Sequence, residues 1–118
     1  MTAARTVATA IALTCLAASG AHAQGRHYAM SGYERNCPLQ TGGEGIIAIG
    51  AGTFSLTETH YDRQSPLNTL PDGWSSATYA IMSEGESYGA ETVRLRVTDR
   101  QVEIVLQDGR TVSGARCR

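Results

Sequence analysis

The residues best suited to chemistry lie together in the middle of the chain, at Glu58, His60 and Tyr61. A carboxylate beside an imidazole can act as a general base or bind a metal ion. On an uninterrupted strand, alternation would place Glu58 and His60 on the same face as Phe54 and Leu56. The other interpretation, which we favour, is that both side chains lie beyond the core at the solvent-exposed end of a strand. A small hydrolase or metal-dependent enzyme built on Glu58 and His60 is therefore only an alternative function.

The rest of the sequence adds little to such a site. A mononuclear metal centre needs about three protein ligands. Beyond the N-terminal stretch 1–23, the only further histidine is His27, and the sequence does not indicate where it lies. We find no nucleophile elbow, zinc-binding helix, phosphate-binding loop or basic-aromatic nucleic-acid motif. We therefore predict no metal, no cofactor and no nucleic-acid partner, and favour a non-enzymatic protein.

Aromatic side chains form the second set of candidates. Trp74 is the only tryptophan, and it ends a stretch, 62–74, whose prolines and Asp-Gly pair predict an irregular surface loop. Trp74 could anchor a partner or cap a barrel, and we favour the cap because a small core needs its largest side chain. If the chain binds a partner, we expect the contact surface to be this loop with Trp74, Tyr61, His60 and Glu58.

The stretch 91–117 predicts a three-strand antiparallel meander. Its first two strands alternate apolar and polar residues with period two, which is typical of strands with one buried face. The apolar positions are Val93, Leu95, Val97, Val102, Ile104 and Leu106. A two-residue loop at Asp99 and Arg100 makes these positions cross-strand pairs on one face. The same register sets Arg96 opposite Glu103 on the outer face, an ion pair worth about 0.2–1 kcal/mol.

The second reversal, at 107–109, has two possible forms. A two-residue Asp-Gly turn puts Val112 on the outer face. A three-residue loop with Gly109 in the left-handed conformation sets Val112 opposite Ile104 and buries both, and we favour it. With that loop Cys117 faces outward unless a bulge intervenes.

Further strands are predicted at four places, separated by Gly, Pro and Asp turns. They are 25–33, with Tyr28 and Met30 on one face; 46–49; 53–61; and 76–83, with Ala77, Tyr79 and Ile81 on one face. Residues 84–89 predict a polar link into the meander. The fold class is therefore all-β, as a small antiparallel barrel or sandwich of about seven strands.

The N-terminus has the three parts of a secretory signal peptide, over residues 1–23. Arg5 supplies positive charge, an apolar run follows at 7–18, and Ala21-His22-Ala23 has the form of a cleavage site. The mature chain, 24–118, is then one small domain that is periplasmic or secreted and has no stable membrane insertion. A retained membrane anchor is the alternative.

Two cysteines remain in the mature chain, Cys37 and Cys117. An even pair in an exported protein predicts a disulfide, here one that ties the start of the domain to its end. A reactive or metal-binding thiol pair is the alternative, although no CxxC motif or flanking histidine favours it.

The layout resembles a loose group of short, mostly uncharacterised exported β-proteins of proteobacteria. The matching features are an aromatic residue before the first cysteine, an isoleucine-rich strand, a mid-chain tryptophan, a Glu-Gly pair and a terminal Arg-Cys: Tyr33, Cys37, 46–49, Trp74, Glu84, Gly85, Arg116 and Cys117. Members often carry a second disulfide, which this chain lacks.

The sequence leaves three non-enzymatic functions open. The first is an exported binding domain whose partner is another envelope protein or a small ligand. Small periplasmic barrels that inhibit lysozymes or proteases are similar in size and strand content, so inhibition of a hydrolase is a second. A structural envelope protein with no specific ligand is the third.

Overall fold

The computed structural model describes residues 25–37 and 43–118, and these contain strands and short 3₁₀ turns but no α-helix. The predicted signal peptide and cleavage site lie outside the described residues. No helix in the described part has the length and hydropathy needed to cross a bilayer. The strands are β1 (Arg26–Ala29), β2 (Ile46–Gly50), β3 (Thr53–Leu56), β4 (Thr59–Arg63), β5 (Asn68–Thr69), β6 (Ser75–Ser83), β7 (Glu86–Val97), β8 (Gln101–Val105) and β9 (Thr111–Arg116); the 3₁₀ turns are η1 (Glu34–Asn36) and η2 (Pro71–Gly73).

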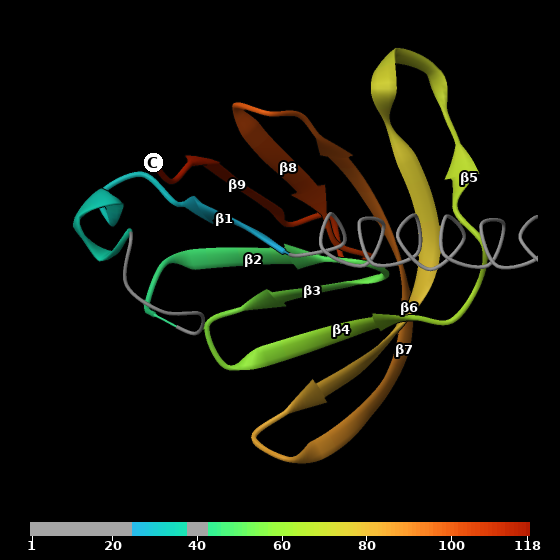
Figure 1. Ribbon diagram of the computed structural model, residues 1–118. Helices are drawn as coiled ribbons and strands as arrows, with labels where there is room; N and C mark the ends of the chain where they lie inside the picture. The colour runs from blue at the N-terminus through green and yellow to red at the C-terminus, as the bar shows by residue number, and fades with distance from the viewer. Residues whose placement is uncertain (1–24, 38–42) are drawn as a thin grey trace, which may run out of the picture.

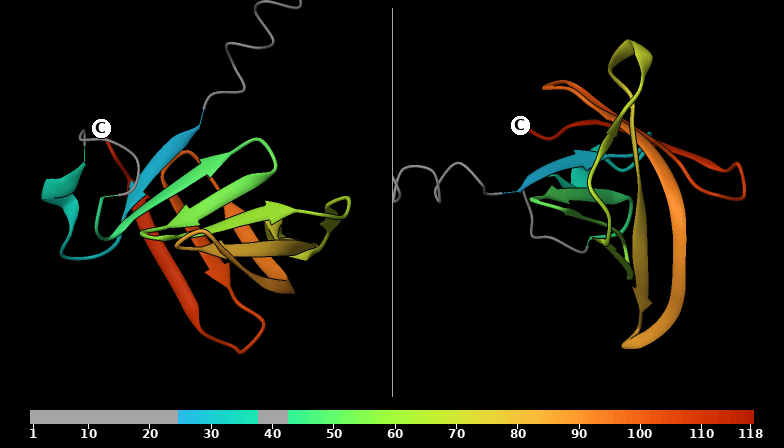
Figure 2. Two further views of the ribbon diagram at one scale, coloured as in Figure 1. Left: turned by 90° about the horizontal axis from the view of Figure 1, so that it is seen from below. Right: turned by 90° about the vertical axis from the view of Figure 1, so that its right-hand side faces the viewer.

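Eight of the nine described strands close into an antiparallel barrel (Figure 1). Strands β1 to β4 pair in chain order, as do β6 to β9, and the pairs β4–β6 and β1–β9 complete the ring. Strand β5 pairs only with the start of β6 and lies outside the ring. Figure 2 shows β6 and β7 as long curved strands on one side, with β2 to β4 on the other. The all-β prediction is confirmed, with a barrel rather than a sandwich and more strands than predicted.

Inward-facing side chains fill the barrel, as alternation along each strand requires. The buried cluster contains Tyr28, Ile47, Phe54, Tyr61, Ala77, Tyr79, Val93, Val102, Ile104 and Leu106. The rings of Phe54 and Tyr61 stack with centroids 4.3 Å apart and an interplanar angle of 8°, and Tyr79 meets Phe54 edge-on at 5.1 Å. Such contacts add about 0.5–1.5 kcal/mol to the burial of each pair.

The predicted register of the meander is confirmed. Leu95 lies opposite Ile104 and Arg96 opposite Glu103, and the Arg96 Nε donates to a Glu103 carboxylate oxygen at 3.0 Å. The second reversal is the three-residue loop: the Leu106 amide donates to the Arg110 carbonyl oxygen, and Gly109 has φ of 93°. Val112 consequently lies opposite Ile104.

Residues 53–61 do not form the single strand that their alternation predicts. Strand β3 ends at Leu56, Thr57 adopts a φ of 41°, and β4 returns antiparallel with Phe54 opposite Tyr61. The reversal is favoured because it stacks both aromatic rings inside the barrel. It also means that Glu58 and His60 do not share a face with Phe54 and Leu56, as an extended strand would have required.

The predicted link at 84–89 is also wrong, because these residues belong to a hairpin. Glu84 and Gly85 have φ of 50° and 82°, which suits a two-residue turn of type I′. Strand β7 therefore begins at Glu86, and the hairpin tip projects away from the barrel (Figure 1). The predicted first strand, 25–33, is shorter than expected and ends at Ala29.

The ladder between β1 and β9 is the shortest in the barrel, with two residue pairs, Tyr28–Arg116 and Ala29–Ala115. The backbones approach closely there, since a Cβ on Gly114 would lie 2.9 Å from the Ala29 carbonyl oxygen. The Tyr28 hydroxyl donates to the Thr98 carbonyl oxygen at 2.8 Å, which ties β1 to the turn between β7 and β8. We call this ladder the seam.

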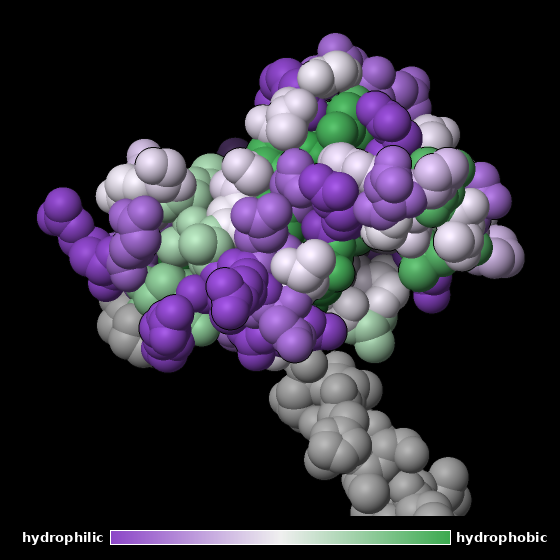
Figure 3. Space-filling model, turned by 90° about the horizontal axis from the view of Figure 1, so that it is seen from above, coloured by the Kyte–Doolittle hydropathy of each residue, from purple (hydrophilic) through white to green (hydrophobic). Residues whose placement is uncertain are grey.

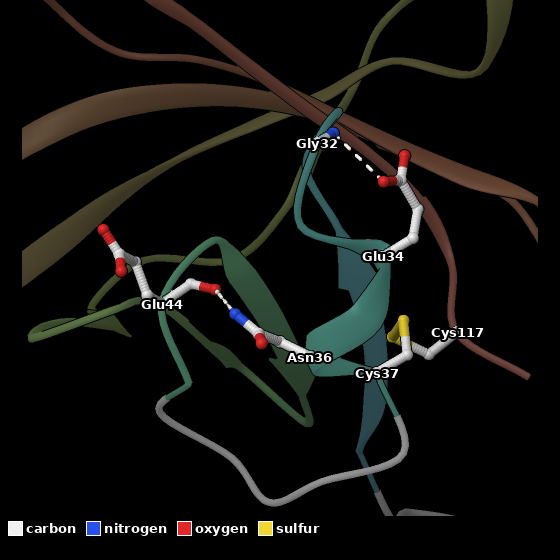
Figure 4. Close-up of a disulfide and its surroundings, with 6 residues drawn as sticks. All are labelled: Gly32, Glu34, Asn36, Cys37, Glu44 and Cys117. Atoms are coloured by element: carbon white, nitrogen blue, oxygen red, sulfur yellow. Dashed lines mark hydrogen bonds between the residues drawn. A yellow bond between two sulfur atoms is a disulfide. The ribbon is translucent and has the colours of Figure 1, made fainter.

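The predicted disulfide is confirmed, and it lies at the seam (Figure 4). It joins Cys37, directly after η1, to Cys117, directly after β9, with Cα atoms 5.3 Å apart. The Cys117 amide also donates to the His27 carbonyl oxygen of β1 at 2.9 Å. Side-chain hydrogen bonds hold η1 in place, including one of 2.8 Å from the Asn36 amide to the Glu44 carbonyl oxygen (Figure 4).

Replacing both Cys37 and Cys117 with Ser should lower the free energy of unfolding by about 4 kcal/mol, because the crosslink closes a long loop in the unfolded chain. The two cysteines are 80 residues apart in the sequence. Urea denaturation of the oxidised wild type, the reduced wild type and the double variant measures the effect. The last two should agree; a double variant as stable as the oxidised wild type would contradict the prediction.

Candidate binding site

One end of the barrel opens into a pocket of about 280 Å³, which we call the mouth pocket. Its apolar walls come from Ile49 of β2, Leu95 and Val97 of β7, and Leu67 of the segment between β4 and β6. Ile49, Leu95 and Val97 also pack against the core, so the pocket lies where the inward-facing rows end. Its volume is close to the lower limit of small-molecule sites, about 300 Å³.

Two arginines line the mouth pocket, Arg26 and Arg63, and none of its described lining residues is Asp or Glu. Arg26 forms an ion pair with Asp99 at 3.4 Å, but the two side chains are 43% and 94% exposed. An exposed pair of this kind holds a charge only weakly. The formal charge of the described lining is therefore positive.

Arg63 is half-buried and lies directly opposite Tyr79 in the β4–β6 ladder, so both side chains share the inner face. A Cβ on Gly52 would lie 3.8 Å from the Arg63 Nη2, which places the guanidinium over the turn between β2 and β3. No acidic side chain in the described part of the chain pairs with it. Arg63 is thus a half-buried cation on the inner face, and the ion pairs of the described residues give it no counter-ion.

Tyr79 also lines the mouth pocket, opposite Arg63 in the β4–β6 ladder. Burial raises the pKa of Tyr79 above its ordinary 10.0, and the nearby charge of Arg63 lowers it in part. The phenol is accordingly neutral at physiological pH and can donate a hydrogen bond into the pocket.

The segment from Gln64 to Trp74 forms the outer wall of the mouth pocket. It is more regular than the predicted loop, because β4 extends to Arg63 and β5 and η2 follow. The Gln64 amide donates to the Thr78 carbonyl oxygen at 2.8 Å, and the Leu70 amide to the Trp74 carbonyl oxygen at 2.8 Å. The start of the segment is therefore fastened to β6, and the second hydrogen bond closes the turn around η2.

We predicted that Trp74 caps the barrel. In the structure it lies on the outer face instead. Ser75 pairs with Leu95 on the inner face, so the preceding position points outward. The guanidinium carbons of Arg94 and Arg96 lie 5.7 and 4.9 Å from the centre of the indole ring. Arg96 also donates to the Asp72 carbonyl oxygen at 3.3 Å. Trp74 and Arg96 together hold the pocket wall against β7.

The other predicted binding residues lie elsewhere. Tyr61 is 5% exposed and points into the core, where burial, followed by the charge of Glu91, raises its pKa. Glu58 and His60 are exposed on the outer face and line a separate depression of about 310 Å³. Within the described residues, no group of three or more His, Cys, Asp or Glu could hold a metal ion. The structure therefore does not bring the four predicted residues together.

Exposed apolar side chains are few among the described residues. Figure 3 shows a face on which hydrophilic side chains predominate, with apolar areas that are small and separate. Among the described residues the exposed large apolar side chains are Leu67, Met82 and Tyr88. Leu67, at 48% exposure, lines the mouth pocket, so it forms an apolar rim there.

Comparison with known proteins adds no further constraint. The chain matches no protein-family model, no curated protein and no solved structure. Arguments about function therefore rest on the residues of this chain.

Replacing Trp74 with Ala should leave the barrel folded and loosen the pocket wall. The lost contacts are cation–π contacts on the outer face, worth about 0.5–1 kcal/mol each at exposed sites. Hydrogen exchange should accelerate at the Leu70 amide, while urea denaturation shows only a small loss of stability. As a control, Phe54→Ala should cost about 3–5 kcal/mol. A loss of that size in the Trp74 variant would show that the indole supports the core after all.

Replacing Tyr79 with Phe should reduce the alkaline loss of stability. The folded-state pKa of Tyr79 is raised, so its contribution is fully present below the unfolded pKa of about 10 and is lost as the pH rises through the folded value. Urea denaturation across the alkaline range should give a shallower decline for Tyr79→Phe than for the wild type. Parallel curves for the two proteins above about pH 10 would contradict this.

Proposed function

We propose that the protein is an exported, non-enzymatic binding domain that holds a small ligand in the mouth pocket. The observation that carries the proposal is the composition of this pocket: apolar walls with a few polar groups directed into it, as is usual for small-molecule sites. Part of the predicted contact loop contributes to it, since Arg63, Leu67 and Gly73 are among the lining residues.

Two observations support export. The sequence at 1–23 has the pattern of a cleavable signal peptide. The Cys37–Cys117 disulfide is of a kind that persists in oxidising compartments and is rare in the cytosol of most organisms. We therefore propose that the domain works in the periplasm or outside the cell.

Binding is better supported than catalysis by Glu58 and His60. Glu58 lies in the β3–β4 turn and His60 on the outer face of β4; both are exposed, and no hydrogen bond joins them among the described residues. Their depression lies over the outer surface of β3, β4 and the β6–β7 turn, away from the barrel interior. A general base needs a substrate held within hydrogen-bonding reach, which is easier to achieve in a pocket than on such a surface.

Filling the mouth pocket tests the proposal. Ser75 lines the pocket from the inner face of β6, whereas its neighbour Ser76 faces outward between β5 and β7. Ser75→Trp should therefore abolish binding, and Ser76→Trp, the same substitution one position along, should preserve it. The probes are a neutral environment-sensitive dye and a panel of short alkyl compounds, followed by fluorescence and by amide shifts of pocket residues.

The wild type should show saturable binding with shifts at Leu95 and Val97. The proposal would be overturned if no compound of the panel bound to the wild type, or if Ser75→Trp bound as the wild type does. Far-ultraviolet circular dichroism of both variants verifies that the barrel has formed.

A further inference from the structure

We infer that the ligand of the mouth pocket is an amphipathic anion, an apolar chain that ends in a carboxylate, and that Arg63 is the residue that binds its charged end. This inference rests on the proposed function and names the class of ligand. It is carried by the position of Arg63, by the charges around it and by the chemistry of the remaining lining.

The position of Arg63 is unusual for a cation. Along β4, Tyr61 and Arg63 are successive inward positions, and Arg63 pairs with Tyr79 across the closing ladder. Arg63 is half-buried, and the hydration that its charge loses there has to be offset by a counter-ion or hydrogen bonds. An anion in the pocket would supply that compensation.

The surrounding charges favour an anion over any other ligand. Arg26 lies at the same mouth, and its exposed partner Asp99 can be replaced by a ligand at small cost. The described lining contains no carboxylate that would repel a negative charge. A cationic ligand would have to approach two guanidinium groups, and among the described residues only the exposed Arg26 has an acidic partner, Asp99.

The chemistry of the donors favours a carboxylate in particular. A guanidinium presents parallel N–H groups that match the two oxygens of a carboxylate. The Tyr79 hydroxyl, which burial keeps protonated, supplies a further donor on the same side. Ile49, Leu95 and Val97 cover the rest of the pocket and contact the apolar part of the ligand.

The test compares three alkyl compounds of one chain length, ending in a carboxylate, an alcohol or an ammonium group. The wild type should bind the carboxylate about ten- to hundredfold more tightly than the alcohol, the range expected for hydrogen bonds to a charged group. It should bind the ammonium compound most weakly. Affinities are measured by titration calorimetry at two salt concentrations.

Arg63→Gln should remove the preference for the carboxylate while leaving the affinity for the alcohol unchanged. The matched control is Arg35→Gln, which removes the same charge from an exposed position of η1 that does not line the mouth pocket and should keep the preference. Arg26→Gln should give an intermediate result, because Arg26 is more exposed than Arg63.

The possible failures separate the two proposals. If the alcohol binds to the wild type as tightly as the carboxylate, or if Arg63→Gln keeps the preference, the anion assignment is overturned while the binding function stands. If none of the three compounds binds, the assignment and the proposed function fall together.

Discussion

The barrel depends on closing its first strand onto its last. The β1–β9 ladder contributes two residue pairs, fewer than any other ladder of the ring, so its own hydrogen bonds are the weakest part of the closure. If the seam opened, Tyr28 would lose its place in the core and two strands would become free edges, which promote aggregation. The disulfide lies beside this short ladder. The hydrogen bond from the Tyr28 hydroxyl to Thr98 adds a second link, between β1 and the β7–β8 turn.

A different closure, between β4 and β6, creates the mouth pocket. It sets Arg63 opposite Tyr79, while the chain between the two strands must pass outside the ring as β5 and η2. That passage would be a free flap if nothing held it. Arg96 contacts Glu103, the Asp72 carbonyl oxygen and the Trp74 ring, and thereby joins the flap to β7 and β8. The Arg96–Glu103 pair was predicted only as an ion pair on the outer face. Through Arg96 it also helps to position the wall of the mouth pocket.

Sequence patterns predicted those parts of the fold in which local and global signals agree. In the meander, alternation, turn length and burial of Val112 all indicate one register, and an even cysteine pair indicates one disulfide. The two turns that the sequence did not predict, at Thr57 and at Glu84, were missed for the same reason. Both residues adopt positive φ without being Gly, Asn or Asp, so neither turn has the Asn-Gly or Asp-Gly pair that marks a two-residue hairpin. Trp74 was placed inside by size alone, although its position relative to Ser75 puts it outside.

The sequence did not indicate the candidate site, because residue types alone do not show which face of a strand a side chain occupies. Glu58 and His60 suggest chemistry by their residue types, yet both side chains are exposed. Arg63 becomes a candidate only when alternation along β4 shows that it faces inward, as Tyr61 does. The inward position of Tyr61 and Arg63 depends on the turn at Thr57, and the regular alternation of residues 53–61 gives no sign of this turn. Leucine at position 63 would extend the apolar row at no electrostatic cost, and no described carboxylate requires a cation there. A charge at such an inward-facing position is consistent with a role beyond packing. The anionic ligand that we propose would bring the negative charge that the described residues around Arg63 do not supply.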